Sequence, residues 1–394
     1  MKVVVVHESY QQPGGEDRAM DADVRLLRSR GHEVVEYRRH NREVEDYSRL
    51  KLGLATIWSR AAHRDLFTLV SQERPDIVHF HNTLPLISPS GLWAARRAGS
   101  RVVQTLHNYR LACPNALFFR RGSVCEDCLR WQIPIPAVVH GCYRGSRTAT
   151  LAVGSMLAVH RLIGTWRRAV DRFIVLTEFQ KARLLRVGLP EGRVAVRPNF
   201  VSPDPGKGSA NGAYALFVGR LTREKGVLTL LHAWQELHER IPLRIVGAGP
   251  LAGEVQRAAQ ENVLLSYLGP TSHDKVLGLM HGASCLVFPS EWYEGLPMTI
   301  VEAFAVGLPV VAAARGAAGE VVVDGRTGFH FRSGDSRDLA DAVSRLVRNN
   351  VRRGSMQAIC RREYLEKYSA EGAYLRLMEI YQEALEVAPF SGSP

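Results

Sequence analysis

The order of apolar segments along the chain limits the fold more than any other feature of the sequence. Short apolar segments typical of strands alternate with stretches spaced like helices, and the same alternation begins again after residue 212. This pattern favours a mostly parallel sheet covered by helices. Between the two series, residues 201–212 read VSPDPGKGSANG, with two Pro, three Gly and almost no apolar residues, which is typical of a linker.

Each series predicts one doubly wound α/β domain, because 394 residues are too many for a single ordinary domain. Ligands of such sheets bind beyond the carboxyl ends of the strands, so we expect two facing domains to share one interdomain cleft. The expected strands are residues 2–7, 34–38, 77–81, 102–107, 173–176, 194–197, 214–219, 243–246, 263–267, 285–288 and 309–313. The expected helices are residues 19–30, 227–239, 274–281, 298–305, 336–348 and 370–387.

Positive charge is concentrated in one part of the chain. The net charge is +12, and residues 96–172 alone hold 13 Arg, no Lys and three acidic residues, a net charge of +10. A solvated surface explains this excess, and so does a surface that meets a nucleic acid, a membrane or a phosphorylated acceptor. The sequence has no nucleic-acid-binding motif, so we expect no nucleic-acid partner.

The N-terminus has the pattern of a buried strand rather than of a secretion signal, since its apolar run is only four Val residues long. No apolar run approaches the ~20 residues of a membrane-spanning helix. We therefore expect a cytoplasmic protein. A helix expected near residues 148–168 carries both apolar and Arg side chains, and it either packs into its own domain or lies on an anionic bilayer. The second alternative predicts a peripheral protein on the inner face of the membrane.

The most informative motif, EGLPMTIVE, runs from Glu294 to Glu302 and follows an expected strand. Pro297 suits the first turn of the helix that contains Glu302. Five residues of helix rise about 7.5 Å. Two carboxylates at that separation could each hold a different sugar ring of one extended ligand, with a diphosphate at the helix N-terminus between them. Acidic residues near a helix start are also favoured by the helix dipole without any ligand.

Three further segments lie where strands are expected to end. The sequence VGRLTREKG places Arg220 and Lys225 before a helix, where two cations beside backbone N–H groups suit a pyrophosphate. Gly14 and Gly15 follow the first strand and allow the close approach of a phosphate. His107 stands at the end of a strand in the first series. Solvated loop charges, a plain tight turn and a structural histidine are the alternatives for these segments taken one at a time.

Together these segments resemble the retaining glycosyltransferases of family 4, whose fold is called GT-B, over nearly the whole chain. The most specific parts are PSEWYEGLPMTIVEAFAVGLPVV, GEVVVDGRTGFHF and VGRLTREKGV. The resemblance implies an α/β fold of two doubly wound Rossmann-like domains. It also implies transfer of a sugar, with retention of anomeric configuration, from a UDP- or GDP-sugar to a hydroxyl group. The acceptor would be a glycan, a lipid-linked molecule or a small molecule.

We predict three segments on this basis. Residues 1–205 form an acceptor-binding domain with a Cys-rich insertion at residues 107–145. Residues 206–369 form the nucleotide-sugar-binding domain, and residues 370–394 form a C-terminal helix that packs back toward the N-terminal domain.

The resemblance also implies roles for single residues. Glu294 would bind hydroxyl groups of the donor sugar, and Glu302 would bind the ribose. Arg220 and Lys225 would neutralise the leaving diphosphate, whose growing charge is the main cost of a front-face displacement. His107 is similar to the active-site histidine of the family, near the donor sugar. The residues whose backbone is expected to contact the donor are Gly14, Gly15, Gly219, Gly295, Leu296 and Pro297.

No metal is needed for catalysis in enzymes of this kind, and no Asp-x-Asp follows an expected strand here. A separate metal hypothesis concerns four clustered cysteines with the spacing C-x11-C-x2-C-x13-C. These are Cys113, Cys125, Cys128 and Cys142. Four thiolates could hold a structural zinc, although only one Cys-x-x-Cys pair is present. An iron–sulfur cluster uses the same ligands, and buried free thiols are the simplest alternative.

Two other functions fit the same pattern. A nucleotide-sugar 2-epimerase would share the architecture but would need an acid–base set in place of an acceptor site. A non-catalytic basic protein that binds membranes would need neither. The segment GAGPLAG lacks the G-x-G-x-x-G spacing, which argues against a dehydrogenase.

Overall fold

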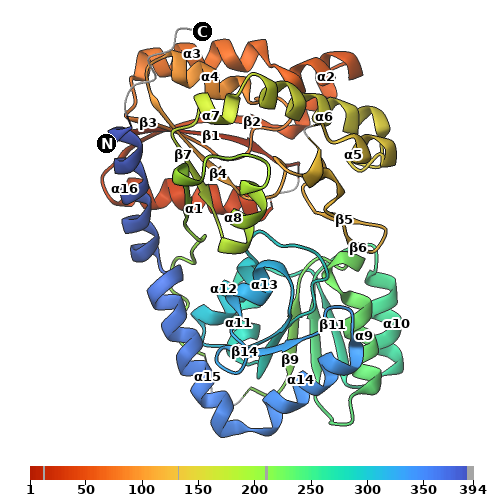
Figure 1. Ribbon diagram of the computed structural model, residues 1–394. Coiled ribbons are helices and arrows are strands. Elements are labelled where there is room, and N and C mark those ends of the chain that lie inside the picture. Colours follow the sequence, from red (N-terminus) through yellow and green to blue (C-terminus); the bar gives the residue numbers. More distant parts are fainter. Residues whose placement is uncertain (12–13, 132, 209–211, 388–394) are drawn as a thin grey trace. The chain divides into compact units, whose positions relative to one another are not determined.

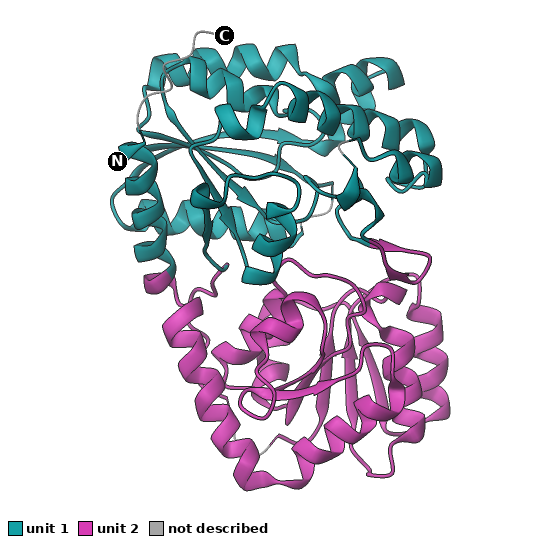
Figure 2. Cartoon of the chain, in the orientation of Figure 1, with its two compact units in different colours: residues 1–118, 126–198, 373–394 teal, residues 119–125, 199–372 magenta. Residues whose placement is uncertain are grey.

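The computed structural model describes residues 1–11, 14–131, 133–208 and 212–387. The chain divides into two compact units (Figure 2). Unit 1 comprises Met1–Phe118, Glu126–Pro198 and Ala373–Pro394. Unit 2 comprises Phe119–Cys125 and Asn199–Gly372, so the C-terminal helix belongs with the N-terminal part of the chain.

Unit 1 is built on a six-stranded parallel sheet with the strand order β2-β1-β3-β4-β7-β8. The four Val residues of the N-terminus lie in β1 and are all buried, as expected for a parallel strand covered on both faces. The strands are β1 (Lys2–Ser9), β2 (Glu33–His40), β3 (Ile77–Phe80), β4 (Arg101–Leu106), β7 (Arg172–Val175) and β8 (Val194–Val196) (Figure 1).

Helices cover both faces of this sheet (Figure 1). On one face, buried side chains of α1 and α16 form a core with β1 and β3 that includes Met20, Leu27, Leu377 and Ile380. The helices of unit 1 are α1 (Gly15–Ser29), α2 (Arg49–Ile57), α3 (Arg60–Glu73), α4 (Ser90–Arg97), α5 (Ile135–His140), α6 (Arg147–Leu162), α7 (Thr165–Arg168), α8 (Glu178–Leu185) and α16 (Ala370–Glu386).

Unit 2 repeats the architecture with the strand order β11-β10-β9-β12-β13-β14, again all parallel. Its strands are β9 (Ala215–Val218), β10 (Leu243–Val246), β11 (Leu265–Gly269), β12 (Cys285–Phe288), β13 (Val310–Ala313) and β14 (Gly328–Phe331). Its helices are α9 (Val227–Glu236), α10 (Ala252–Glu261), α11 (His273–His281), α12 (Met298–Ala305), α13 (Gly316–Val321), α14 (Ser336–Arg348) and α15 (Asn350–Glu363). A two-stranded antiparallel hairpin, β5 (Phe119–Arg120) and β6 (Ser123–Val124), lies in the Cys-rich insertion.

The two parallel sheets confirm the predicted α/β class, and three local predictions need correction. The helix expected near residues 148–168 is two helices, α6 and α7, because Gly164 between them has a φ of 70°. Pro297 precedes α12 rather than lying in its first turn, with an extended ψ of 100°. Strand β14 was not expected, because its four residues include a Gly and follow a polar turn.

One buried arginine joins three elements of unit 1. Arg197, 1% exposed, follows β8, and its Nη2 and Nη1 lie 2.6 and 3.1 Å from the two carboxylate oxygens of Asp23 in α1. Its Nε donates to the carbonyl oxygen of Ala373 in α16 at 3.0 Å. The chain leaves unit 1 after Pro198 and returns at Ala373. Arg197 therefore bonds to Asp23 and Ala373 next to both of these points.

We expect Arg197→Met to lower the free energy of unfolding by about 3–5 kcal/mol, because it leaves the buried Asp23 carboxylate without its cation. The double variant with Asp23→Leu should recover part of this loss, because both charges are then removed together. Arg38→Met, which breaks an exposed ion pair with Asp21, is the control and should cost less than about 1 kcal/mol. Denaturant unfolding followed by circular dichroism measures all three, and equal small losses for Arg197→Met and Arg38→Met would contradict the assignment.

Candidate functional site

The strand order of each sheet reverses at one point, and loops on either side of such a point form ligand sites in doubly wound sheets. In unit 2 the reversal lies between β9 and β12, and in unit 1 it lies between β1 and β3. Most of the residues predicted as site residues follow these strands. Each unit has a candidate site of its own at this point, and the two sites are described separately.

The candidate site in unit 2 is built around an ion pair between Lys225 and Glu294. Lys225 follows β9, Glu294 follows β12, and their Nζ and Oε1 atoms are 2.6 Å apart. The same Oε1 accepts hydrogen bonds from Ser290 Oγ and Trp292 Nε1, both at 2.8 Å. Because Glu294 is only 8% exposed, these three contacts hold its carboxylate in one orientation.

The backbone between β9 and α9 allows these two loops to approach closely. Gly226 has a φ of 70°, and a Cβ atom at this position would lie 1.9 Å from the carbonyl oxygen of Pro289. Only glycine fits that geometry without strain. The backbone N–H of Glu291 also donates to the carbonyl oxygen of Glu224 at 2.8 Å, which ties the two loops together.

The other predicted residues of unit 2 differ in exposure and in their contacts. Glu302 lies in α12, 13% exposed at its side chain, with His273 Nδ1 3.7 Å from its Oε1. Arg220 extends into solvent, 63% exposed at its side chain, and its Nη2 is 3.6 Å from Glu224 Oε1. Gly219 donates its backbone N–H to Val246 in the neighbouring strand β10 at 3.0 Å, so that amide is engaged within unit 2. The residues that connect Glu294 to α12 are Gly295, Leu296 and Pro297.

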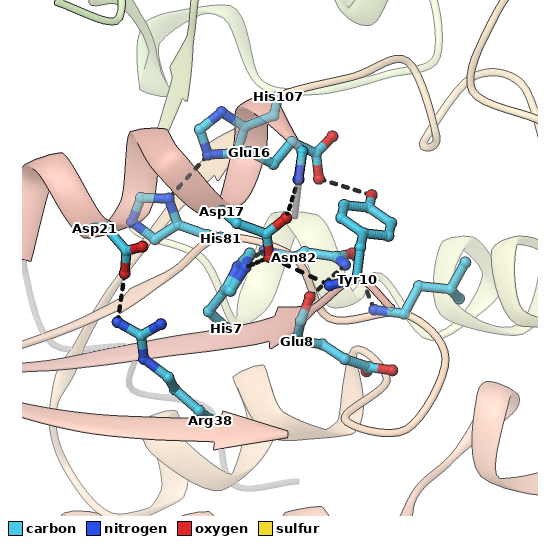
Figure 3. Close-up of polar contacts among 12 residues, drawn as sticks. His7, Glu8, Tyr10, Glu16, Asp17, Asp21, Arg38, His81, Asn82 and His107 are labelled. Atoms are coloured by element: carbon cyan, nitrogen blue, oxygen red, sulfur yellow. Dashed lines mark hydrogen bonds and ion pairs between the residues drawn. The ribbon is translucent and has the colours of Figure 1, made fainter. Parts of the chain in front are cut away.

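The candidate site in unit 1 is a network of carboxylates and imidazoles at the carboxyl ends of β1, β3 and β4 and in the first turn of α1 (Figure 3). Glu16 accepts hydrogen bonds from Asn108 Nδ2 at 2.6 Å and from Tyr10 Oη at 2.8 Å. Asp17 lies 3.0 Å from His7 Nε2. Burial of Asp17 pushes its pKa upward, but hydrogen bonds from His7 and from backbone N–H groups outweigh burial, so its pKa is lowered and it is a carboxylate at neutral pH.

His107 is paired with a second histidine rather than standing alone. Its Nε2 is 2.9 Å from His81 Nδ1, and the two rings stack with centroids 5.1 Å apart. Burial lowers the pKa of both imidazoles, that of His81 well below its usual range. Both rings are therefore neutral at physiological pH, and they act as hydrogen-bonding groups rather than as cations.

The predicted glycine pair lies at the start of α1. The backbone N–H of Gly14 donates to Asp17 Oδ2 at 2.7 Å, and the contact of this pair with a diphosphate stays a prediction. Gly15 is the first residue of α1, and the next two residues, Glu16 and Asp17, place acidic groups in the first helical turn. Gln12 and Pro13 of the same motif lie outside the described residues.

Sequence reasoning missed several of the residues that shape these two sites, although a signal for one of them was present. The dipeptide His81-Asn82 follows β3 and repeats the His107-Asn108 dipeptide that follows β4. Parallel neighbouring strands bring such repeats together, so His81 could have been found from its partner. The other missed residues are His7, Tyr10, Glu16, Asp17, Ser290 and Trp292.

The four clustered cysteines do not form a recognisable metal site. Among the residues that the structure describes, no group of three or more His, Cys, Asp and Glu side chains is placed to hold a metal ion. All of these cysteines are without disulfide bonds. The arrangement therefore does not support the zinc site predicted at Cys113, Cys125, Cys128 and Cys142.

Two family models match this chain. A model of Glycosyltransferase Family 4 matches residues 13–205, and a model of Glycosyl transferases group 1 matches residues 212–349. Together the two models match most of the chain, one on each side of the predicted linker. The chain belongs to glycosyltransferase family 4.

Individual relatives match parts of this chain. A D-inositol 3-phosphate glycosyltransferase of Corynebacterium aurimucosum is 32% identical over 183 residues, which are 43% of this chain and 43% of that protein. The chain spans about half the length of the curated relatives it matches.

Solved structures support the GT-B fold over nearly the whole chain. A glycosyltransferase of Rickettsia africae has a TM-score of 0.71 at 16% identity and covers 98% of this chain and 99% of its own. Anabaena HepE, crystallised with UDP and glucose, has a TM-score of 0.68 at 16% identity and covers 97% of this chain and 99% of its own. Within residues 1–11, 14–131, 133–208 and 212–387, every helix is too short or too polar to cross a membrane.

Proposed function

We propose that this protein is a retaining glycosyltransferase that moves a sugar from a nucleotide-diphosphate sugar, a UDP- or GDP-sugar, to a hydroxyl group of an acceptor. The ion pair of Lys225 and Glu294 at the switch point of unit 2 carries this proposal. It places an ammonium group and an oriented carboxylate where ligands of such sheets bind. Family membership and the UDP bound in the structure of HepE support it.

The proposed chemistry follows from the charges at this site. Breaking the bond to the donor sugar leaves negative charge on the diphosphate, and cations already in place lower the cost of that charge. We assign this role to Lys225, with Arg220 as a second cation. The Glu294 carboxylate accepts hydrogen bonds from sugar hydroxyl groups, and Glu302 accepts them from the ribose.

The role of His107 depends on its protonation state. Because burial lowers its pKa, we propose that it offers a neutral imidazole to the ligand and takes no part as a cation. His81 positions it through the 2.9 Å hydrogen bond between the two rings.

Substitution of the central pair tests the proposal. A thermal-shift screen of UDP- and GDP-sugars first identifies the donor, and release of nucleoside diphosphate with and without acceptors then measures turnover. We expect Lys225→Met to lower kcat on the order of 10²-fold, as for a lost transition-state contact. Glu294→Gln should lower turnover more than donor binding.

The matched control is Arg223→Ala, an exposed cation in the same turn as Lys225. It should leave kcat unchanged. Unchanged turnover in both Lys225→Met and Glu294→Gln, with melting temperatures showing folded protein, would remove the basis of the proposal. Release of nucleoside diphosphate only with acceptor separates transfer from 2-epimerisation.

We further propose that catalysis needs no metal ion, because Lys225 and the N-terminus of α12 supply the positive charge that a metal would otherwise supply. Treatment with EDTA should therefore leave the rate of sugar transfer unchanged. Metal analysis of the same sample tests the zinc hypothesis separately. A stoichiometry of about one zinc per chain would restore a structural site at the four cysteines, whereas a rate that falls with EDTA and returns with Mg²⁺ would contradict metal-independent catalysis.

We propose a peripheral membrane contact for unit 1, carried by exposed apolar side chains on three neighbouring helices, α2, α5 and α6 (Figure 1). We call this set the apolar surface of unit 1. Exposed Arg49 and Lys51 of α2 add positive charge to it, which suits an anionic bilayer. Its members are Leu50, Leu54, Ile135, Val139, Leu151, Val159 and Leu162, each at least 37% exposed. Two of the residues first expected to face the membrane, Met156 and Trp166, are buried instead.

Vesicle sedimentation tests this contact. The protein should bind vesicles containing phosphatidylglycerol, bind less at high salt and not bind vesicles of phosphatidylcholine alone. The variant Leu54→Gln with Leu162→Gln should bind severalfold more weakly. Val263→Gln, which changes an 86% exposed apolar residue of unit 2, is the control and should bind normally. Equal binding to both kinds of vesicle, or to neither, would contradict the proposal.

A further inference from the structure

Glu8 is a fully buried carboxylate at the carboxyl end of β1. Its Oε2 accepts hydrogen bonds from the backbone N–H groups of Leu86 and Ile87, at 2.8 and 3.1 Å. These two residues belong to the segment that follows β3, residues 82–87, which we call the β3 loop. The side chain of Glu8 therefore joins the end of β1 to the β3 loop.

The backbone of Glu8 contacts the same loop (Figure 3). Its N–H donates to the carbonyl oxygen of Asn82 at 2.9 Å, and its carbonyl oxygen accepts from Asn82 Nδ2 at 2.8 Å. Asn82 Oδ1 in turn accepts from the backbone N–H of Leu84 at 3.2 Å. Glu8 thus makes two hydrogen bonds to the β3 loop through its backbone and two through its carboxylate.

The β3 loop forms part of the candidate site of unit 1. It begins directly after His81, whose ring bonds to that of His107 at 2.9 Å. The residues that line a pocket next to this pair include His81, Asn82, Leu84, Gln104, His107 and Trp166. The position of the β3 loop therefore affects the shape of the pocket beside the two histidines.

The backbone directly after the β3 loop is strained. Ser88 has a φ of 55°, in the left-handed region that residues other than glycine rarely adopt. Its N–H donates to the carbonyl oxygen of Thr83 at 2.7 Å, which closes the loop. Such a conformation persists only where neighbouring contacts hold it. Leu86 and Ile87, whose N–H groups Glu8 binds, stand immediately before Ser88.

Glu8 has no cation beside it. In the part of the chain that the structure describes, it forms no ion pair, and its Oε1 lacks a hydrogen-bond partner. Another buried carboxylate of unit 1, Asp171, has Arg96 Nη1 2.9 Å from its Oδ1. Burial of a carboxylate without a cation is costly, and protonation removes that cost. Oε1 is the oxygen that takes the proton, because Oε2 already accepts two hydrogen bonds.

Two charged residues act on Glu8 from neighbouring elements. Arg39 lies opposite it in β2, and Glu43 lies in the 3-10 helix Asn41–Asp46. They pair with each other, with Arg39 Nη2 2.6 Å from Glu43 Oε2. The charge of Arg39 lowers the pKa of Glu8, and the charge of Glu43 raises it.

The other titratable groups around the end of β1 leave Glu8 unpaired. His7 points to the opposite face of the sheet, where its Nε2 lies 3.0 Å from Asp17 in α1. His81, after β3, is neutral because burial lowers its pKa. The β3 loop itself contains no charged or titratable residue. Arg39 and Glu43 are therefore the charges that set the electrostatic surroundings of Glu8.

Burial raises the pKa of Glu8 to about 7, and the hydrogen bonds from Ile87 and Leu86 and the charge of Arg39 lower it less than burial raises it. Glu8 is therefore ionised above neutral pH and protonated below it. The ionised form holds the β3 loop more firmly, because a charged acceptor binds N–H groups about twice as strongly as a neutral one. The same charge lowers stability. Since the pKa lies above the usual 4.5, the free energy of unfolding falls as the pH rises through about 7.

We propose that Glu8 is a positioning residue for sugar transfer: its ionised carboxylate holds the β3 loop in the arrangement that transfer requires, and protonation weakens that hold. Because Glu8 is enclosed, it acts through the backbone of Leu86 and Ile87 and not by touching the substrates. Its charge thus costs stability and supports activity. The inference rests on the proposed transferase activity, which supplies the kinetic measurement.

The pH dependence of transfer tests the proposal. With the donor and acceptor identified, kcat of the parent should rise as the pH increases through about 7. Glu8→Gln copies the protonated form, so this rise should disappear. Its kcat should be about tenfold below that of the parent at about pH 8 and equal to it at about pH 6. Binding of nucleoside diphosphate should be unchanged. A rise that persists in Glu8→Gln contradicts the proposal.

Two charge variants test the electrostatic argument. Arg39→Met removes the charge that lowers the pKa of Glu8, so the midpoint of the profile should move to higher pH. Glu43→Gln removes the charge that raises it, so the midpoint should move to lower pH. Asp171→Asn is the control and should keep the midpoint of the parent, because Asp171 accepts from the N–H of Val102 and not from the β3 loop. Midpoints that stay fixed in both charge variants, or move in the same direction, overturn the proposal.

Melting temperatures separate positioning from a purely structural role. At about pH 8, Glu8→Gln should melt at a higher temperature than the parent, because it removes a buried charge that has no cation, and at about pH 5 the two should melt alike. Asp171→Asn should melt lower than the parent at both pH values, since it leaves Arg96 without its anion. A lower melting temperature of Glu8→Gln at alkaline pH, together with an unchanged pH profile of kcat, would show a structural role only.

Amide exchange in the parent provides a test that needs neither a variant nor activity. The protection of the Leu86 and Ile87 N–H groups, measured by NMR relative to their intrinsic exchange rates, should increase as the pH rises through about 7. Equal protection on both sides of this pH rejects the role of Glu8. If the protein consumes no nucleotide sugar, the transferase proposal fails, whereas amide exchange and melting still decide whether the charge of Glu8 holds the β3 loop.

Discussion

In each unit all six strands of the main sheet run in the same direction, and the candidate site of each unit depends on that constraint. Parallel strands place all their carboxyl ends at one edge, so loops that are far apart in sequence meet there. The ion pair of Lys225 and Glu294 joins residues 69 positions apart because β9 and β12 are neighbours. The pair of His81 and His107 meets because β3 and β4 are neighbours.

The candidate sites of the two units differ in their charges. In unit 2 a buried carboxylate is balanced by an ammonium group and two hydrogen-bond donors, an arrangement suited to a ligand that carries both charge and hydroxyl groups. In unit 1 burial keeps the paired imidazoles neutral. The carboxylates of Glu16 and Asp17 accept hydrogen bonds from neighbouring side chains. The site of unit 1 therefore offers neutral imidazoles, whereas the site of unit 2 offers an ammonium group beside a carboxylate.

The sequence alone predicted the architecture well, because buried parallel strands are short continuous apolar runs that stand out from their surroundings. It was weaker where packing decides the outcome. The break between α6 and α7 depends on the left-handed backbone of Gly164, and an apolar pattern runs through it without interruption. The amide of Gly14 donates to a carboxylate three residues later, a contact that the glycine pair in the sequence did not predict.

What the sequence by itself determined is therefore the two-sheet fold, the family and the identity of the charged residues that follow β9 and β12. Periodicity and short motifs are local properties, and they can be read along the chain. Only the tertiary structure decided which side chains share a site: that Ser290 and Trp292 orient Glu294, that His81 pairs with His107, and that Gln104 and Trp166 line the same pocket. These are contacts between distant segments, and they follow from strand order and helix packing, which no single stretch of sequence encodes.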